Sequence, residues 1–123
     1  MGRYYEGDIN GKFWFGVQSS NDADFFGSEG YQPFLEYYFD KENLNDINEG
    51  IKTCKKQLKG YNKKLDDFFG SVNGYNDEML TEALQCHQDK ARDLLVWYAR
   101  LRLGLKIQKC VKKQGDCSFQ AEI

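Results

Sequence analysis

Apolar and charged residues alternate over positions 5–18 of the chain. Most apolar residues stand at odd positions and the charged ones at even positions, which is the period of a half-buried β-strand. Asn10-Gly11 marks a turn between two strands. A three-residue loop, 9–11, puts the apolar residues of both strands on one face and pairs Asp8 with Lys12. We therefore predict a β-hairpin with this register.

Two further stretches carry a strand pattern. Residues 19–33 hold turn and cap residue types and the one proline, and predict a loop with at most one helical turn. The short aromatic segment 34–39 that follows predicts a third strand. Near the end of the chain, residues 117–123 alternate behind a glycine turn. Together with 106–112 they predict a C-terminal β-hairpin.

Apolar residues repeat at heptad spacing in two long segments between these strands. The first seam runs from 44 to 68 and the second from 80 to 105, each in steps of three and four residues, which is typical of packed helices. Beyond Leu105, the next positions at heptad spacing are the polar residues Gln108 and Lys112. Because the apolar seam stops there, we expect the second helix to end near Leu103–Leu105, beside Gly104. The glycine-containing segment 70–74 joins the two helices, and the pair predicts an antiparallel helical hairpin.

The element order β-β-β-α-α-β-β predicts an α+β fold with a mainly antiparallel sheet and a long antiparallel helical hairpin, built as a single domain over 1–123. Helices of about 26 residues are about 39 Å long, whereas strands of six or seven residues span about 20 Å. Part of the hairpin should overhang the sheet. We therefore expect a homo-oligomer through helices 44–68 and 80–105.

The composition indicates where in the cell the protein resides and whether its cysteines are oxidised. The chain has 123 residues and 15% aromatic residues, enough for one core without cross-links. Met1-Gly2-Arg3 begins no apolar run, and no stretch approaches the ~18 apolar residues of a membrane span. We expect a cytoplasmic protein with no membrane segment. Its four cysteines should then be free thiols.

Charge is distributed unevenly along the chain. Residues 1–50 carry ten acidic and three basic residues, a net charge of −7, and residues 51–123 carry nine acidic and fourteen basic ones, a net charge of +5. Either the two halves pack through complementary surfaces, or an acidic face, a basic face or both meet a partner. The sequence pI near 5.4 makes nucleic acid an unfavoured partner, despite the basic last third.

No spacing of reactive residues predicts a catalytic or metal site. Structural zinc needs ligand pairs two to four residues apart, but Cys86 and His87 are adjacent, and Cys110 and Cys117 are seven apart. The chain has neither a G-x-S-x-G nucleophile elbow nor a phosphate-binding glycine loop. We expect no cofactor. Cys54 and His87 fall on the helical seams, where packed thiols and a core histidine are favoured over a metal or redox pair.

The first hairpin provides the candidate binding face, because its predicted register puts Tyr4 and Trp14 on the side away from the core. Aromatic residues ringed by polar ones mark many interfaces; the alternative is that loop 19–33 covers them. The candidate binding residues are Arg3, Tyr4, Lys12, Trp14, Arg100 and Arg102.

We expect a non-enzymatic protein that binds a partner protein or a small anionic ligand. A compact chain of this kind suits a phage or viral accessory protein that inhibits or sequesters a host component. An acidic mimic of nucleic acid and a small enzyme with a Tyr/Asp/Arg site are the alternatives.

Overall fold

A computed structural model describes residues 3–14, 17–27, 35–71 and 76–122. Within these ranges, four strands form one antiparallel sheet in the order β2-β1-β4-β3. Strand β1 spans Tyr4–Gly7, β2 Gly11–Lys12, β3 Leu35–Asp40 and β4 Asp116–Ala121. The third strand thus forms where the aromatic segment predicted it, and β4 confirms the strand expected at the C-terminal end.

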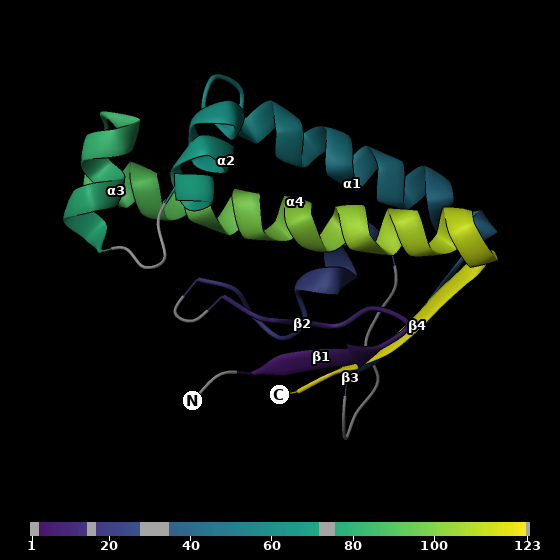
Figure 1. The fold of residues 1–123 in the computed structure, drawn as a ribbon. Coiled ribbons are helices and arrows are strands. Elements are labelled where there is room, and N and C mark those ends of the chain that lie inside the picture. The colour runs from purple at the N-terminus through teal and green to yellow at the C-terminus, as the bar shows by residue number, and fades with distance from the viewer. Residues whose placement is uncertain (1–2, 15–16, 28–34, 72–75, 123) are drawn as a thin grey trace.

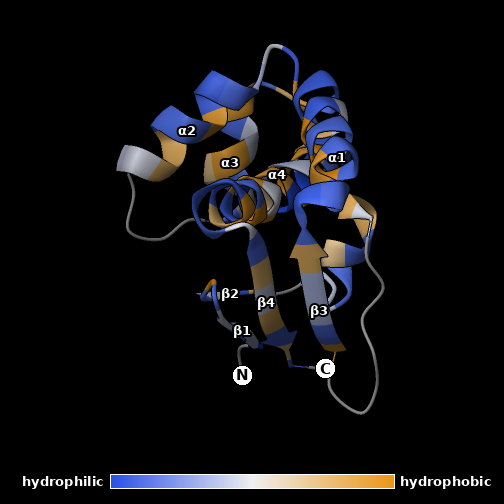
Figure 2. Ribbon diagram, turned by 90° about the vertical axis from the view of Figure 1, so that its right-hand side faces the viewer, coloured by the Kyte–Doolittle hydropathy of each residue, from blue (hydrophilic) through white to orange (hydrophobic). Residues whose placement is uncertain are grey.

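The helices form a layer on one side of the sheet (Figures 1 and 2). Helix α1 spans Leu44–Gln57, α2 Asn62–Ser71, α3 Asp77–Leu84 and α4 Gln88–Gln114, and two short 3-10 helices, η1 and η2, span Asp22–Phe26 and Lys41–Asn43. The long α4 crosses the sheet and α1 runs antiparallel beside it (Figure 1). The α+β class, the antiparallel sheet and the helical hairpin are confirmed.

The core lies between the sheet and α4. Alternate residues of β3 and β4 point toward the helices, and their rings stack, with the centroids of Tyr37 and Phe119 5.2 Å apart. Ile107 of α4 and Ile47 of α1 are fully buried against this layer. Because each such side chain contributes roughly 1.5–3 kcal/mol on full burial, this interface fixes which face of the sheet is covered.

Gly104 does not end the second helix, and the expected strand over 106–112 is wrong because α4 continues to Gln114. A Cβ atom at Gly104 would lie 2.5 Å from the ring of Phe26, so the glycine lets η1 pack closely against α4. The helix ends instead at Gly115, whose φ of 92° gives the left-handed C-cap conformation that favours glycine. Of the predicted C-terminal hairpin, only β4 forms.

Each of the two predicted long helices, 44–68 and 80–105, is wrong as a continuous helix. The first breaks between α1 and α2, where Gly60 has a φ of 87°, although Leu58 and Leu65 on its seam are fully buried. The second breaks between α3 and α4 at Gln85, which has a φ of 54°. Heptad spacing therefore predicted most of the buried face, with His87 and Leu105 as exposed exceptions, but not the breaks in the backbone.

The predicted register of the first hairpin is wrong. Tyr4 pairs with Lys12 and Tyr5 with Gly11. Asp8 pairs with β4 instead of Lys12: its N–H donates to the Ser118 carbonyl at 2.8 Å, and its carboxylate accepts from the Ser118 N–H at 2.8 Å. The C-terminal strand therefore sets where β1 ends, which no pattern within residues 1–18 indicates.

Candidate functional site

The six predicted binding residues do not form one face. Tyr4 and Lys12 are cross-strand partners at the edge of the sheet, and the ammonium group of Lys12 lies 5.9 Å from the centre of the Tyr4 ring. Arg3 and Trp14 contact residues outside the sheet, namely Ser20 and Phe69. Arg100 and Arg102 both belong to α4 in the helical layer. Their roles in binding remain predictions, but their positions define separate regions.

Trp14 does not share a face with Tyr4. The chain leaves the sheet after Lys12, and the Trp14 ring packs edge-on against Phe69 of α2 at 5.1 Å and Tyr98 of α4 at 5.8 Å. These rings belong to the helical layer, so the indole joins the sheet-side loop to the helices. The expectation of an outward-facing Trp14 is wrong because it depended on the incorrect hairpin register.

Arg3 and Arg100 hold a polar network beneath η1. The carboxylate of Asp22 is buried; it accepts from Nε of Arg100 at 2.7 Å and from the side-chain amide of Gln18 at 2.9 Å. Nη1 of Arg3 donates to the Ser20 hydroxyl at 2.7 Å. A buried carboxylate needs such partners, so Arg100 holds Asp22 of η1 against α4, and Arg3 ties Ser20 to the start of β1.

The thiols and the histidine do not form a pair. Cys54 is buried and free, as expected, and burial raises its pKa to about 11. His87 is exposed at the N-cap of α4, which corrects the prediction of a core histidine. In the described ranges, no group of three or more His, Cys, Asp or Glu side chains is placed to hold a metal ion.

Two tyrosine hydroxyls bind carboxylates inside the molecule. Burial, together with the hydrogen bond to Asp24, raises the pKa of Tyr37 far above its usual range. Burial and the hydrogen bond to Asp66, at 2.6 Å, also raise the pKa of Tyr98. Both hydroxyls therefore stay protonated near neutral pH and act as donors, whereas a general base needs a pKa near the working pH.

The side of the sheet away from the helices carries exposed polar and aromatic residues, and we call it the outer sheet face. Its members alternate with the buried residues of β1, β3 and β4, and they are Tyr4, Glu6, Glu36, Tyr38, Ser118 and Gln120. Tyr4 is 51% exposed and Tyr38 is 54% exposed, so about half of each side chain is available to a partner.

The register places Glu6, Gln120 and Glu36 in one row across three strands. The Gln120 amide donates to the Glu36 carboxylate at 3.2 Å, and the row lines a shallow concavity of about 620 Å³. Tyr4 and Tyr38 flank this row on opposite sides, one from β1 and one from β3. The outer sheet face is thus an acidic row between two half-exposed tyrosines.

Sequence reasoning missed Glu36 and Tyr38 as site residues. Segment 34–39 was predicted as a strand, and its alternation with Leu35, Tyr37 and Phe39 could have assigned both residues to the opposite face. The sequence therefore indicated which face these residues occupy, but it did not indicate where β3 lies in the sheet.

Comparisons with known proteins give no assignment, because no family model, curated protein or solved structure matches the chain significantly. Among the described residues, no helix is both long and apolar enough to span a bilayer. The geometry of the chain itself is therefore the basis for a functional proposal.

Proposed function

We propose that the protein is a non-enzymatic binding protein whose outer sheet face docks a basic segment of a partner protein. The observation that carries this proposal is the row of Glu6, Gln120 and Glu36 flanked by two half-exposed tyrosines. Tyrosine offers a large rigid surface at low entropic cost. Carboxylates on the same face steer and select a partner that carries lysine or arginine.

A catalytic role is less well supported. The two tyrosine hydroxyls that bind carboxylates, Tyr37 and Tyr98, have raised pKa values, so neither is suited to accept a proton near neutral pH. A Tyr/Asp/Arg enzyme, one of the alternatives from the sequence, would need such a base or a nucleophile activated by one. Binding requires neither.

An acidic mimic of nucleic acid would use the same face. In that form, the partner's basic segment is itself a site that binds nucleic acid. A phage or viral accessory role, in which the protein sequesters a host component, is compatible with either form and rests on the size of the chain. Self-association through the helical layer is a separate proposal. Figure 1 supports it only in that α3 and the start of α4 extend past the sheet.

Site-specific photo-cross-linking tests the proposal. A photoreactive phenylalanine analogue replaces Tyr38 on the outer sheet face, and in a matched variant it replaces Lys52, which is exposed on α1. Each protein is irradiated in a lysate of the cell type that makes it, and cross-linked peptides are identified by mass spectrometry. We expect cross-links from position 38 to a segment rich in lysine and arginine, and none to that segment from position 52.

A charge-reversal variant then tests the electrostatic part. Glu6→Lys with Glu36→Lys should weaken binding of the captured partner at least about tenfold, because like charges at an interface cost more than about 1.4 kcal/mol. Duplex DNA that displaces the partner would identify the mimic form. Unchanged affinity in the double variant, or cross-links to the same segment from both positions, would overturn the proposal.

A further inference from the structure

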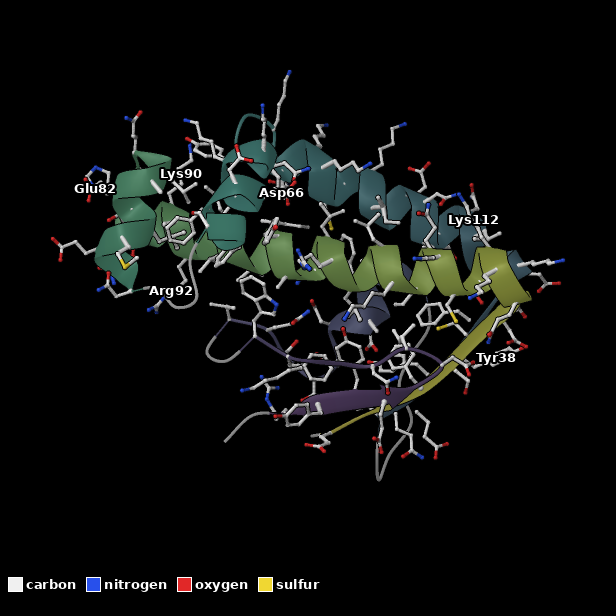
Figure 3. The ribbon with its side chains drawn as sticks, in the orientation of Figure 1. Tyr38, Asp66, Glu82, Lys90, Arg92 and Lys112 are labelled. Carbon is white, nitrogen blue, oxygen red and sulfur yellow. The ribbon has the colours of Figure 1, made fainter. Side chains whose placement is uncertain are left out.

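The helical layer contains a groove on which the proposed function does not depend. It has a volume of about 500 Å³ and lies between the end of α1, the start of α2 and the middle of α4. Four of its lining residues are cations and one is a carboxylate: Lys55, Arg102, Lys106, Lys109 and Asp66. Asp66 in this layer and Tyr38 on the sheet lie at separate parts of the molecule (Figure 3).

The helix geometry explains why the cations gather. Arg102, Lys106 and Lys109 are four and three residues apart on α4, a spacing that puts them on one face over about 10 Å. Residues 94–115 contain no Asp or Glu, so no acidic neighbour on the same helix can pair with these cations one turn away. Lys55 contributes a fourth cation from α1.

The contacts of these cations leave their charges uncompensated. Nη1 of Arg102 donates to the Tyr98 hydroxyl at 3.3 Å, and Nζ of Lys106 donates to the Tyr5 hydroxyl at 2.9 Å and the Asn10 carbonyl at 3.0 Å. All three acceptors are neutral. Across the described part of the chain, none of the four groove cations forms an ion pair with a carboxylate.

The one carboxylate among the described lining residues is already engaged. Asp66 accepts a hydrogen bond from the Tyr98 hydroxyl at 2.6 Å, and the four cations exceed it by three charges. Like charges around a concave surface repel one another and concentrate counter-ions there. A ligand with several negative charges would relieve that repulsion, whereas a monocarboxylate would leave most of it.

The groove also offers apolar surface. Leu105 lines it and is 39% exposed, whereas Leu101 and Tyr98, which also line it, are almost fully buried. Ligand pockets combine such apolar walls with a few charged groups that fix orientation. The guanidinium of Arg102 can present two parallel N–H donors to a phosphate, which a lysine cannot do.

We propose that this groove binds a small organic molecule carrying at least two phosphate groups, such as a nucleoside diphosphate. The phosphates would lie between Lys55 on α1 and Arg102 and Lys109 on α4, and the ammonium group of Lys106, held by Tyr5 and Asn10, would lie on the side nearer the sheet. The organic part would cover Leu105. This inference is independent of the outer sheet face.

Calorimetric titration with ADP, pyrophosphate and a short single-stranded oligonucleotide tests the proposal at low salt. ADP should bind with a measurable Kd and more tightly than pyrophosphate, because pyrophosphate lacks an organic part that covers Leu105. Raising the salt concentration should weaken binding. No ADP binding at 1 mM, or tighter binding of the oligonucleotide per site than of ADP, would overturn it.

Matched lysine variants on α1 show whether the groove is responsible. Lys55→Gln and Arg102→Gln should each weaken ADP binding about tenfold, whereas Lys52→Gln, one turn from Lys55 and outside the groove, should change it less than about twofold. Thermal melting of each variant shows that it is folded. Glu36→Lys on the outer sheet face should leave the Kd for ADP unchanged, which separates this test from that of the proposed function. Equal losses for Lys52→Gln and Lys55→Gln would reduce the effect to net charge and contradict the proposal.

Discussion

The outer sheet face and the helical groove carry opposite charges, and the residues that give each region its sign of charge come from opposite halves of the chain. Glu6 and Glu36 of the face come from residues 1–50, whereas all the groove cations come from residues 51–123. Arg100 and Asp22 do join the halves by a partly buried ion pair. The glutamates of the face and the lysines of the groove nevertheless stay exposed at separate surfaces. Charge asymmetry along a chain thus need not mean that its halves neutralise one another.

The two regions also differ in how the backbone builds them. The face follows from strand alternation, so Glu36 and Tyr38, which alternate with the buried residues of β3, both belong to it. The groove follows from helical spacing on α4 and from the turn between α1 and α2 that brings Lys55 and Asp66 to the same place. A local change in register would therefore alter the face, whereas the groove depends on helix packing.

Leu58→Asp should have the largest effect, because it removes the support of the groove. Leu58 is fully buried at the joint between α1 and α2, and an unpaired charge there should reduce the free energy of unfolding by more than about 4 kcal/mol. With a total stability of about 5–15 kcal/mol, this loss removes about a quarter or more of it, so circular dichroism should show a melting temperature lowered by more than about 10 °C. Lys59→Asp, at the exposed neighbouring position, is the control and should melt near the wild-type temperature.

Trp14→Ala distinguishes a residue of the interior from a residue of the outer sheet face. The indole packs on Phe69 and Tyr98, so its removal should cost about 2–4 kcal/mol of unfolding free energy. Tyr4→Ala, at a 51% exposed side chain, should cost about 0.5 kcal/mol. Chemical denaturation measures both, and equal losses would mean that the two aromatic residues do not belong to different regions.

High pH should lower the free energy of unfolding, because a thiol buried in the interior between the two regions loses its proton more easily in the unfolded chain. Burial raises the pKa of Cys54 from its ordinary 9.0 to about 11, so the unfolded chain loses this proton first as pH rises. Stability should be complete below pH 9 and fall by roughly 2–3 kcal/mol by pH 11 from this thiol alone.

The buried hydroxyls of Tyr37 and Tyr98, whose pKa values are also raised, add to the same trend. Urea unfolding between pH 8 and pH 11 measures it. Cys54→Ala should have a shallower decline than the wild type, and identical slopes would contradict the assignment of this thiol.

Gly104→Ala tests whether α4 passes tightly over η1, which aligns the groove cations. The added Cβ would lie 2.5 Å from the Phe26 ring, and overpacking of this kind costs about 1–3 kcal/mol. The better helix propensity of alanine offsets about 1 kcal/mol of that cost.

Gly70→Ala in α2, where a Cβ would meet nothing within 4 Å, is the matched control and should stabilise the protein slightly. Differential scanning calorimetry should show melting temperatures that move in opposite directions. A rise for both variants would mean that η1 does not pack closely at Gly104.

Features that depend on neighbouring residues were predicted correctly from the sequence, whereas features that depend on contacts between distant segments were not. Heptad spacing correctly predicted the burial of Leu58 and Leu65, because periodicity reports which face of a helix is apolar. The hairpin register depended on Ser118, more than a hundred residues from its partner Asp8. Gly104 was misinterpreted because its close neighbour, Phe26, comes from a distant segment.

The same contrast between local and long-range interactions applies to the outer sheet face and the groove. Tyr4 was predicted to be on the exposed side, and it is, because one strand's alternation decides it. The groove was missed because the helix was expected to end near Gly104, and the row of Arg102, Lys106 and Lys109 exists only when α4 continues through that residue. Lys55 joins that row through tertiary packing, which no single-segment pattern contains.

The separation of the two surfaces is tested most directly by a backbone ¹H–¹⁵N NMR titration of the wild-type protein with two probes in turn. A short lysine- and arginine-rich peptide should shift amide signals around Glu36 and Gln120. ADP should shift those around Lys55 and Arg102, and each probe should still bind when the other is present. Shifts at the same residues from both probes, or competition between them, would contradict two separate binding surfaces of opposite charge.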